Sequence, residues 1–561
     1  MRLKRKGLKL LALLLGLSLV ATACGGDDSD DAGDNTDETE APDEGVAGGE
    51  FVDLGTIVGD PLEHIDPALN VTLDGFQVTN ALYDGLTEID FADPENPEIK
   101  GQVAESWESN DDGTEWTFTI KDGLEFSNGD PVLPSSFQLA WERASDPDFA
   151  GQYSYLFNFL EGGAEKLDGT ADTISGLTAD DDAMTLTTTL SAPYANWATV
   201  AGFQLFYPMP AEVEGLADQN EWENGLMIGN GPYKLESART TEEIVLVKND
   251  TWAGDQNGET WDERLDKITF RTQADPDTAY NAFEAGEGDN STIPPGRWGE
   301  ASENHPNTIS PAIGVRYFEL AWDDPAIGGE ENVKLREAIM LAINREEISE
   351  AVYDGTNPVA TSLVPPGIPG QQPDICEFCR YDVEAATAAF EEWEAAGNSQ
   401  AEPLKIQLNA DAGHEPVVQV IIDNLQEVGI EAVADPYPTE TYFSELPDTC
   451  VMCRSGWYAD YPTYDNFTYD LFHSDSIGGN NHGGYSNPEF DALIDEAKAT
   501  TDEAAATELY NQAEDILLNQ DIGVVPYLYY SLDYVYSDDT VASFPVNALG
   551  LVLWEQIRLK G

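Results

Sequence analysis

The segment CRSGWYADYP, residues 453–462, places three chemically different side chains at intervals of three residues. Arg454 is a cation, Trp457 is a large apolar ring and Asp460 is an anion. A carboxylate can pair with an ammonium group, and a guanidinium can bind a carboxylate through two parallel hydrogen bonds. One interpretation is a pocket for a ligand that has a positive end, a negative end and an apolar middle. The second interpretation is a surface ion pair beside a tryptophan of the core.

The geometry of such a pocket depends on the backbone of the segment. In a β-strand, successive side chains alternate between the two faces. Arg454, Gly456 and Asp460 would then share one face, and Trp457 would lie on the other. All three side chains can reach one ligand only if the chain bends, so we expect a bend after Trp457.

The histidines and the known catalytic motifs give no sign of a reaction. The five histidines form no H-E-x-x-H pair; they are His64, His305, His414, His473 and His482. The last two lie in the stretch LFHSDSIGGNNHGGY, which favours a polar glycine-rich loop, with a metal site as the alternative. The chain also lacks a G-x-S-x-G motif and a phosphate-binding loop. We therefore expect no metal, no cofactor and no enzymatic activity.

The overall charge argues against one class of partner. The 561 residues include 26 Lys and Arg but 106 Asp and Glu, which gives a net charge of −80. Nucleic-acid binding needs clusters of Lys and Arg, so we expect no nucleic-acid partner. Copies of a protein with so acidic a surface repel one another, which favours a monomer. Salt screens this repulsion, so the charge also suits a saline habitat. The length predicts about two to four lobes rather than one core.

The amino terminus has the pattern of an export signal. A basic start, residues 2–9, precedes the apolar run LLALLLGLSLVATA, residues 10–23, which is too short to span a bilayer comfortably. The small residues before Cys24 resemble the bacterial lipobox, which implies that Cys24 becomes the lipidated first residue of the mature protein. The alternative is an ordinary secretory signal with an incidental cysteine. We expect residues 1–24 to be a lipoprotein signal, and the mature chain to be held by lipid on the outer face of the cytoplasmic membrane or in the periplasm.

An acidic spacer follows this cysteine. Residues 25–50 contain eleven acidic side chains, no basic ones and no aromatic rings. Such a stretch cannot bury a core, so we expect a disordered tether. A metal-binding acidic run is the alternative, but the stretch lacks the spacing of a calcium loop.

Four further cysteines form two C-x-x-C pairs, Cys376 with Cys379 and Cys450 with Cys453. Two such pairs can hold zinc, although their long separation is unusual for a compact zinc site. Exported proteins in an oxidising space more often form disulfides, and we expect disulfides here. Pairing within each motif and pairing between the two motifs both stay open.

Hydrophobic periodicity beyond residue 51 predicts a mixed α/β fold. Alternating stretches predict strands at 183–190, 243–249, 266–272 and 316–322, and a hairpin within 115–126 that turns at Asp122–Gly123. Helical spacing predicts helices at 331–355, 382–397, 415–429, 487–499 and 502–520. Asp382 and Asn487 are the expected N-cap residues of two of these helices.

Several segments, taken in order, resemble one known family. They are HIDPAL (64–69), ALYDGLTEID (81–90), GNGPYKL (229–235), KLREAIMLAINREEI (334–348), LVPPG (363–367), GWYADYP (456–462) and YSNPEFDALIDEA (485–497). The chain resembles the extracellular solute-binding proteins of peptide-type ABC importers, the oligopeptide- and dipeptide-binding family 5. The resemblance covers nearly all of residues 51–561.

The resemblance implies a two-lobed α/β fold of the periplasmic-binding-protein type, class II, in its large peptide-binding form. The first lobe would take 51–85, 228–316 and 525–561, and the second lobe 317–524. An extra small domain of the first lobe would take 86–227. Crossing strands near 316–322 and 524–530 would join the lobes, which would close on the ligand.

The resemblance also implies roles for the opening segment. Asp460 matches an aspartate that pairs with the α-ammonium of the ligand, and Arg454 matches an arginine that can meet a carboxylate. Ser455, Gly456 and Trp457 resemble a strand to which an extended peptide adds, with Trp457 as an apolar wall and Tyr458 in the same segment. The competing interpretation is a structural carboxylate at Asp460 and a core tryptophan at Trp457. Residues 68–72 are expected to supply the first lobe's half of the clamp.

The function that follows from this resemblance is capture without covalent chemistry. We expect a lipid-anchored protein that binds short peptides and delivers them to membrane permease subunits, with ATPases on other chains driving import. A second hypothesis keeps the fold but has it bind oligosaccharides, nickel or opine-like solutes. An exported hydrolase is a third hypothesis, and a surface adhesin or sensor is a fourth.

Overall fold

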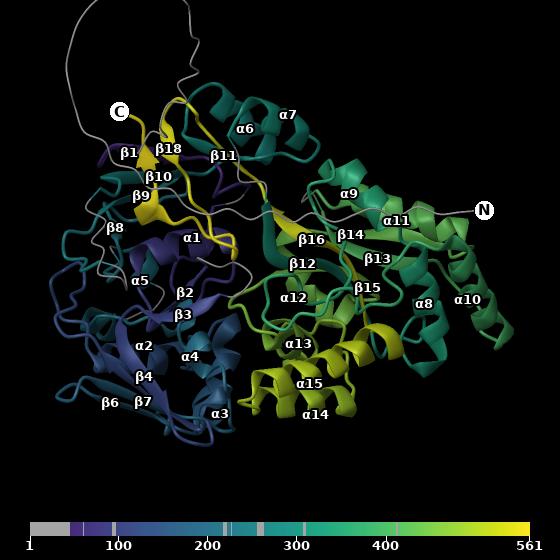
Figure 1. Cartoon of the computed structure of the whole chain (residues 1–561), viewed down its shortest axis with the longest axis horizontal. Coiled ribbons are helices and arrows are strands. Elements are labelled where there is room, and N and C mark those ends of the chain that lie inside the picture. The colour runs from purple at the N-terminus through teal and green to yellow at the C-terminus, as the bar shows by residue number, and fades with distance from the viewer. Residues whose placement is uncertain are drawn as a thin grey trace, which may run out of the picture. The chain divides into compact units, whose positions relative to one another are not determined.

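A computed structural model describes residues 45–59, 61–91, 97–216, 221–225, 227–254, 263–306, 310–410 and 413–561 (Figure 1). The expected signal 1–24, the lipidation candidate Cys24 and the expected tether as far as residue 44 lie outside these residues. From Gly45 onward the chain is tied to the fold, because the Val46 N–H donates to the Leu559 carbonyl at 2.7 Å. Regular structure begins at Glu50, at the end of the stretch expected to be a tether.

The first lobe is built on a six-stranded sheet whose strands come from three separate parts of the chain. The strand order is β17-β11-β1-β10-β9-β8, with β1 (Glu50–Asp53), β8 (Tyr233–Leu235), β9 (Glu243–Lys248), β10 (Lys267–Arg271), β11 (Asn290–Thr292) and β17 (Tyr534–Tyr536). Strand β1 pairs in parallel with β10 and β11, and the outer pairs are antiparallel. The lobe also contains α1 (Leu73–Leu82), α6 (Pro276–Glu284), α7 (Trp298–Asn304), β18 (Val541–Ser543) and β19 (Arg558–Leu559). The strands predicted at 243–249 and 266–272 are confirmed as β9 and β10.

A five-stranded mixed sheet forms the second lobe, in the order β14-β13-β15-β12-β16. Its strands are β12 (Ser310–Leu320), β13 (Leu404–Asn409), β14 (Ala432–Tyr437), β15 (Met452–Tyr458) and β16 (Val524–Leu532). Its helices are α8 (Val333–Ala342), α9 (Arg345–Tyr353), α10 (Val383–Ala395), α11 (Glu415–Glu427), α12 (Thr439–Thr449), α13 (Asp465–Phe472), α14 (Pro488–Lys498) and α15 (Glu503–Asp515). Figure 1 shows α14 and α15 packed side by side, and these two helices contact each other extensively.

A smaller α/β unit lies between the parts of the first lobe in sequence. Its four-stranded antiparallel sheet has the order β4-β5-β7-β6, with β4 (Ala104–Ser109), β5 (Glu115–Ile120), β6 (Leu177–Asp180) and β7 (Thr185–Thr189). A second pair is β2 (Thr87–Asp90) with β3 (Glu98–Gly101), and the helices are α2 (Pro134–Ala144), α3 (Gly163–Leu167), α4 (Trp197–Val200), α5 (Glu221–Asn224) and the 3₁₀ turn η1 (Gln152–Phe159). We call this unit the small domain.

The chain passes between the lobes at the outer ends of two long strands. Strands β12 and β16 lie in the second lobe's sheet over their whole length. After β16 ends at Leu532, only Asp533 separates it from β17 in the first lobe's sheet. Strand β12 also pairs with β15 as far as Gly314, so it belongs to the second lobe's sheet. The chain therefore crosses between the lobes at the outer ends of β12 and β16.

Two local predictions differ from the structure. The single helix expected at 331–355 is divided into α8 and α9, because the Asn344 side chain accepts from the Glu347 N–H and starts a new helix. The hairpin expected at Asp122–Gly123 also fails, since β5 pairs with β4 and β7 instead. A tight turn forms further on, where the Val132 N–H donates to the Leu124 carbonyl around Gly129, whose φ is +89°.

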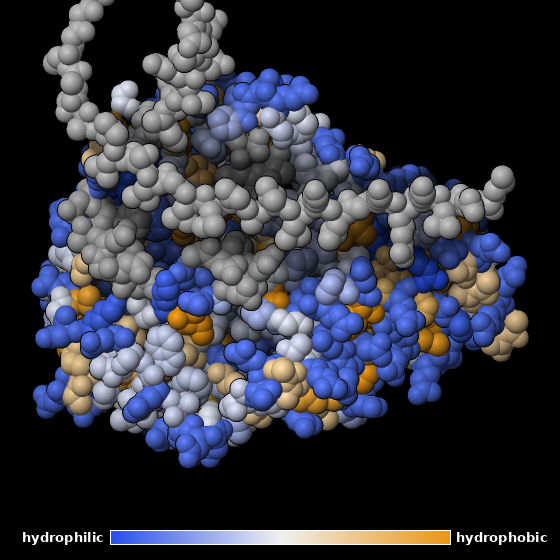
Figure 2. Space-filling view, viewed as in Figure 1, coloured by the Kyte–Doolittle hydropathy of each residue, from blue (hydrophilic) through white to orange (hydrophobic). Residues whose placement is uncertain are grey.

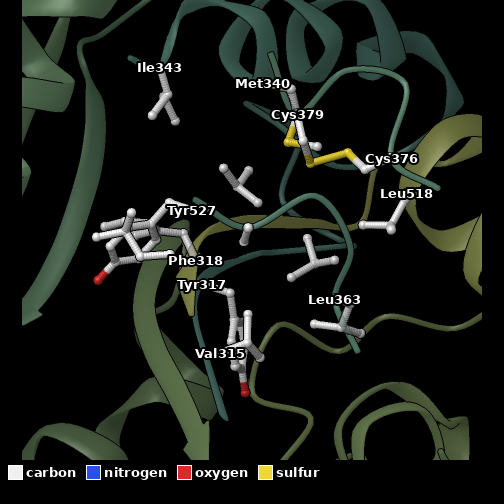
Figure 3. Close-up of a cluster of buried hydrophobic side chains, with 14 of the residues drawn as sticks. Val315, Tyr317, Phe318, Met340, Ile343, Leu363, Cys376, Cys379, Leu518 and Tyr527 are labelled. Atoms are coloured by element: carbon white, nitrogen blue, oxygen red, sulfur yellow. A yellow bond between two sulfur atoms is a disulfide. The ribbon is translucent and has the colours of Figure 1, made fainter. Parts of the chain in front are cut away.

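Two large clusters of buried side chains form the hydrophobic core. One fills the second lobe and continues into the first lobe at residues such as Tyr280 and Trp298, and the other fills most of the first lobe together with the small domain. Figure 3 shows part of the second lobe's cluster, where the disulfide between Cys376 and Cys379 lies among residues such as Met340 and Leu363. The second disulfide joins Cys450 to Cys453, so the structure pairs each C-x-x-C motif within itself.

The surface of the described residues is largely polar on the face shown in Figure 2, where hydrophilic side chains predominate over the coloured part. Within the described ranges, no helix is long and apolar enough to cross a membrane.

Candidate ligand-binding site

A cavity of about 1940 Å³ lies between the two lobes. It is larger than the roughly 300–1,000 Å³ that a pocket for a drug-sized ligand needs. Its wall includes residues of the first lobe, the small domain and the second lobe's strand β15. Among the described residues that line it, eight are carboxylates and none is Lys or Arg; the carboxylates are Glu63, Asp74, Asp84, Glu88, Asp275, Asp277, Asp460 and Glu555.

Strand β15 offers a partly open edge to this cavity. On one side it pairs with β12 over its whole length, but on the other it pairs with β13 only at Met452 and Cys453. The Tyr442 hydroxyl of α12 lies between the two strands, 3.1 Å from the Gln407 carbonyl and 2.8 Å from the Arg454 carbonyl. This side chain separates β13 from β15, and no described strand pairs with that edge of β15 beyond Cys453.

Two residues present backbone groups at this open edge. In a strand, the N–H and C=O of one residue point to one side, and the side alternates along the chain. The Ala459 N–H donates to Ile313 of β12, whereas the Arg454 carbonyl faces Tyr442. Gly456 and Tyr458 therefore direct their N–H and C=O groups away from β12, toward the open edge. An extended chain can pair with these groups as an added strand.

Beyond β15 the chain bends, and this bend decides which side chains meet. Strand β15 ends at Tyr458, so the bend comes one residue later than expected. Asp460 then lies on the cavity wall together with Trp457, and both contact Asn466. Arg454 lies on the opposite face of the sheet, where its guanidinium is 3.5 Å from the Tyr530 hydroxyl. The structure thus brings Trp457 and Asp460 together and separates Arg454 from them.

Asn466 is the residue that organises this corner, and sequence reasoning missed it. It is fully buried at the start of α13. Its side-chain oxygen accepts from the Trp457 indole N–H at 3.1 Å and from the Asp460 N–H at 3.0 Å. Its amide nitrogen donates to the carboxylates of Asp460, at 3.3 Å, and Asp470, at 2.9 Å. One amide group therefore fixes the ring, the bend and two carboxylates.

The Asp460 carboxyl is held in an environment that disfavours its charge. Burial, together with the neighbouring Asp470, raises the pKa of Asp460 to about 8, although Asn466 and Tyr153 bond to it. Burial and the carboxylate of Asp465 likewise raise the pKa of Asp470 to about 7. No cation lies within ion-pair distance of Asp460 among the described residues. The surroundings of Asp460 therefore contain no positive charge, and the ammonium group of a ligand can supply one.

Arg454 belongs to a second group of polar side chains. Arg316 of β12 lies opposite Gly456, and its guanidinium stacks on the Tyr530 ring at 3.9 Å. His414 is buried nearby, where burial and the charges of Arg454 and Arg316 hold its pKa well below the usual range. The Nε of Arg454 and the Nδ1 of His414 are buried without a partner. Within the described residues, neither arginine has a carboxylate at ion-pair distance, so positive charge collects here without an acidic partner. We call Arg454, Arg316 and His414 the cationic group.

The first lobe lines the cavity at the end of the expected stretch 68–72 and at the two residues that follow it. Val71, Thr72, Leu73 and Asp74 are on the wall, and Thr72 caps α1 by accepting from the Gly75 N–H at 3.2 Å. Burial and the nearby Asp53 raise the pKa of Asp74 to about 7. This wall is therefore also short of positive charge.

The small domain closes one side of the cavity by contacting the second lobe. The Tyr153 hydroxyl donates to the Asp460 carboxylate at 3.0 Å, and the Gln152 amide donates to Asn480 at 2.9 Å. The Ala195 N–H donates to the Lys498 carbonyl at 3.1 Å. These contacts make Asp460 a residue shared by two domains.

The metal alternative for the glycine-rich loop finds no support in the geometry. His473 faces Asp491 and Asp495, whereas His482 pairs with Glu319. No group of three or more His, Cys, Asp or Glu side chains among the described residues has a metal-binding arrangement.

A two-lobed α/β fold with a cavity between its lobes is the architecture of binding proteins that close on a ligand. The chain belongs to the bacterial extracellular solute-binding proteins, family 5, because the model of the middle part of that family matches residues 98–479.

Individual relatives agree with this assignment. The chain is 28% identical over 485 residues to the oligopeptide-binding protein OppA of Bacillus subtilis, covering 82% of this chain and 84% of OppA. It is 25% identical over 560 residues to the dipeptide-binding protein DppE of the same organism, covering 96% and 97% of the two chains. Among solved structures, Haemophilus influenzae OppA in complex with RPPGFSPFR matches with a TM-score of 0.73 and 25% identity, over 92% of this chain and 99% of that one.

Proposed function

We propose that this protein is the peptide-capturing component of an ABC importer. The observation that carries the proposal is the open edge of β15, which ends at a carboxylate that has no cation within the described residues. Backbone pairing at an edge reads no side chain, and a fixed carboxylate selects an ammonium group. Together these two features fit the amino-terminal part of a peptide. The names of the relatives, which include oligopeptide- and dipeptide-binding proteins, support the same ligand class.

The ligand would lie antiparallel to β15, with its ammonium on Asp460. Its main chain would pair with Gly456 and Tyr458, while Trp457 forms an apolar wall and Ser455 lies at the far end. At about 3.3 Å per residue, the edge between Asp460 and Arg454 accommodates roughly five or six ligand residues. The ligand class is therefore short peptides.

The cationic group of Arg454, Arg316 and His414 is the proposed place for a ligand carboxylate. Gly413, which precedes His414, lies on the cavity wall, and so do Gly456 and Tyr458 from the same face as Arg454. A carboxylate that enters there would give partners to Arg454, Arg316 and His414 at once. Arg454 is not among the described residues that line the cavity, so the ligand carboxylate would have to extend beyond the wall at Gly456 to meet the guanidinium.

The rest of the proposal concerns where the protein works. Lipid on Cys24 would hold the mature chain on the outer face of the membrane as a monomer, and the acidic residues 25–44 would let it move between the bulk and the permease subunits. Delivery to the permease would follow closure of the lobes on the peptide.

Identification of co-purified material tests the proposed function. Residues 24–561 can be purified from a bacterial host, with Cys24 replaced by Ser, and examined by native mass spectrometry. The expected result is a set of bound masses that resolve, on denaturation, into short peptides of mixed sequence. Sugars, a metal complex or an opine-like compound as the bound material would contradict the peptide assignment.

Binding is expected to release a proton at slightly acidic pH. The pKa of Asp460 is raised to about 8 by burial and Asp470, so the empty site is mostly protonated below that pH. A ligand ammonium favours the carboxylate, and therefore expels the proton on binding. Calorimetric titration at about pH 6.5 in two buffers of different ionisation enthalpy measures the released protons. A value near one proton is expected, and a value near zero would contradict the pairing.

A further inference from the structure

His482 is the one basic side chain among the described residues that line the cavity. It lies in the glycine-rich loop, and Gly478, Gly479 and Asn480 of this loop are on the same wall. Phe443 of α12 is also on the wall, with its ring centroid 6.1 Å from the imidazole. The other charged side chains on the wall are carboxylates, so this imidazole lies in acidic surroundings.

A buried carboxylate holds this imidazole in place. Glu319 of β12 is 1% exposed and has its Oε1 3.0 Å from Nδ1 of His482. Its other oxygen accepts from the Gly483 N–H at 2.8 Å. Neither Lys nor Arg reaches Glu319 among the described residues, and a buried carboxylate needs a cation to offset the loss of hydration. His482 is the side chain placed to supply that cation.

The pKa of His482 agrees with this assignment. Burial alone lowers it, but the charge of Glu319 and the hydrogen bond to it outweigh burial, so the pKa is raised above its usual range. The imidazolium uses Nδ1 for Glu319, which leaves the Nε2–H as a second donor. No described protein atom accepts from this nitrogen, so a hydrogen bond and a positive charge remain available at the wall.

We propose that His482, positioned by Glu319, binds a carboxylate of the ligand and so makes the protein favour peptides that carry one. The proposal rests on the proposed function and adds to it a second recognition point. Glu319 lies opposite Cys453, seven residues before Asp460 along the chain. At about 3.3 Å per residue, this point is roughly 20 Å from the ammonium site, so the later residues of a ligand reach it. The carboxylate belongs either to an Asp or Glu side chain or to the carboxyl terminus of the peptide.

A positional scan separates these two sources. The probes are alanine heptapeptides with one Glu at each position from three to seven, the matched Gln peptides, and every peptide with a free or an amidated carboxyl terminus. Affinity for the protein and for His482→Gln is measured by calorimetry. His305→Gln is the matched control, since His305 is outside the cavity wall and bonds to Glu284.

For the unaltered protein, one Glu position or the free carboxyl terminus is expected to improve affinity about ten- to a hundredfold over its neutral match. This ratio should fall to about one in His482→Gln and stay unchanged in His305→Gln, while the amidated Gln peptides bind all three proteins alike. Glu319→Gln, which removes the positioning charge, should lower the same ratio. A dependence on Glu position assigns the carboxylate to a side chain, and a dependence on amidation assigns it to the terminus.

Two results would overturn the inference, and they can be told apart. If the peptides bind but no carboxylate improves affinity, or if the ratio survives in His482→Gln, this inference alone fails. If none of the peptides binds the unaltered protein, the proposed function fails and this inference fails with it.

Discussion

Asp460→Asn is expected to weaken the binding of a peptide with a free amino terminus by about a hundredfold or more. The change keeps the shape of the side chain, and the amide can still contact Asn466 and Tyr153, which are the present partners of the carboxylate. What it removes is the negative charge that offsets the dehydration of the ligand ammonium in a closed cavity. An ammonium left in the cavity without that charge is strongly disfavoured.

Two controls make this result specific. N-acetylated peptides, which have no ammonium, should bind the unaltered protein and Asp460→Asn with similar low affinity. Asp111→Asn, an exposed residue of the small domain that is absent from the cavity wall, should leave both affinities unchanged. Equal affinity of the unaltered protein and Asp460→Asn for free peptides, measured by calorimetry, would show that Asp460 has a structural role.

Asn466→Asp is expected to reduce both stability and ligand binding more than any change at the surface. The fully buried amide donates to Asp460 and Asp470, and a carboxylate in its place would put a third acid between them. The pKa values of these two aspartates are already raised, to about 8 and about 7, from 3.8. Three adjacent acids cannot all ionise in a buried corner without a large cost.

The pH dependence of unfolding gives this prediction its sign. A carboxyl whose pKa is raised on folding binds more protons in the folded state, so stability falls as pH rises through the window between the two pKa values. We expect the free energy of unfolding of Asn466→Asp to fall more steeply than that of the unaltered protein between about pH 4 and pH 8. Asn281→Asp, an exposed change on α6, is the matched control, and parallel curves for all three proteins would contradict the argument.

The family and much of the local structure follow from sequence patterns. The side chains of Asp382 and Asn487 cap α10 and α14 as expected, because an N-cap depends on residues that are neighbours in the chain. The two-lobed α/β fold and the membership of family 5 are confirmed. Local rules failed where a second signal competed, as at Asn344, where a polar cap divides a continuous helical pattern.

The arrangement of the site was less predictable, because it depends on contacts between distant parts of the chain. The opening segment was recognisable, but the partners that orient it were not. Tyr153 meets Asp460 across 307 positions, and His482 meets Glu319 across 163. No periodicity links such pairs, and Asn466 has no motif that marks it. A bend near Trp457 was expected, but that it moves Asp460 to the side of Trp457 and leaves Arg454 on the other face depends on packing.

The measurement that tests the central claim most directly is a crystal structure of residues 24–561, with Cys24 replaced by Ser, in complex with a pentapeptide. We expect an extended peptide that runs antiparallel to β15, with main-chain hydrogen bonds to Gly456 and Tyr458. Its ammonium would lie within hydrogen-bond distance of the Asp460 carboxylate. A peptide that runs in the opposite direction, or that binds without touching β15, would contradict the account.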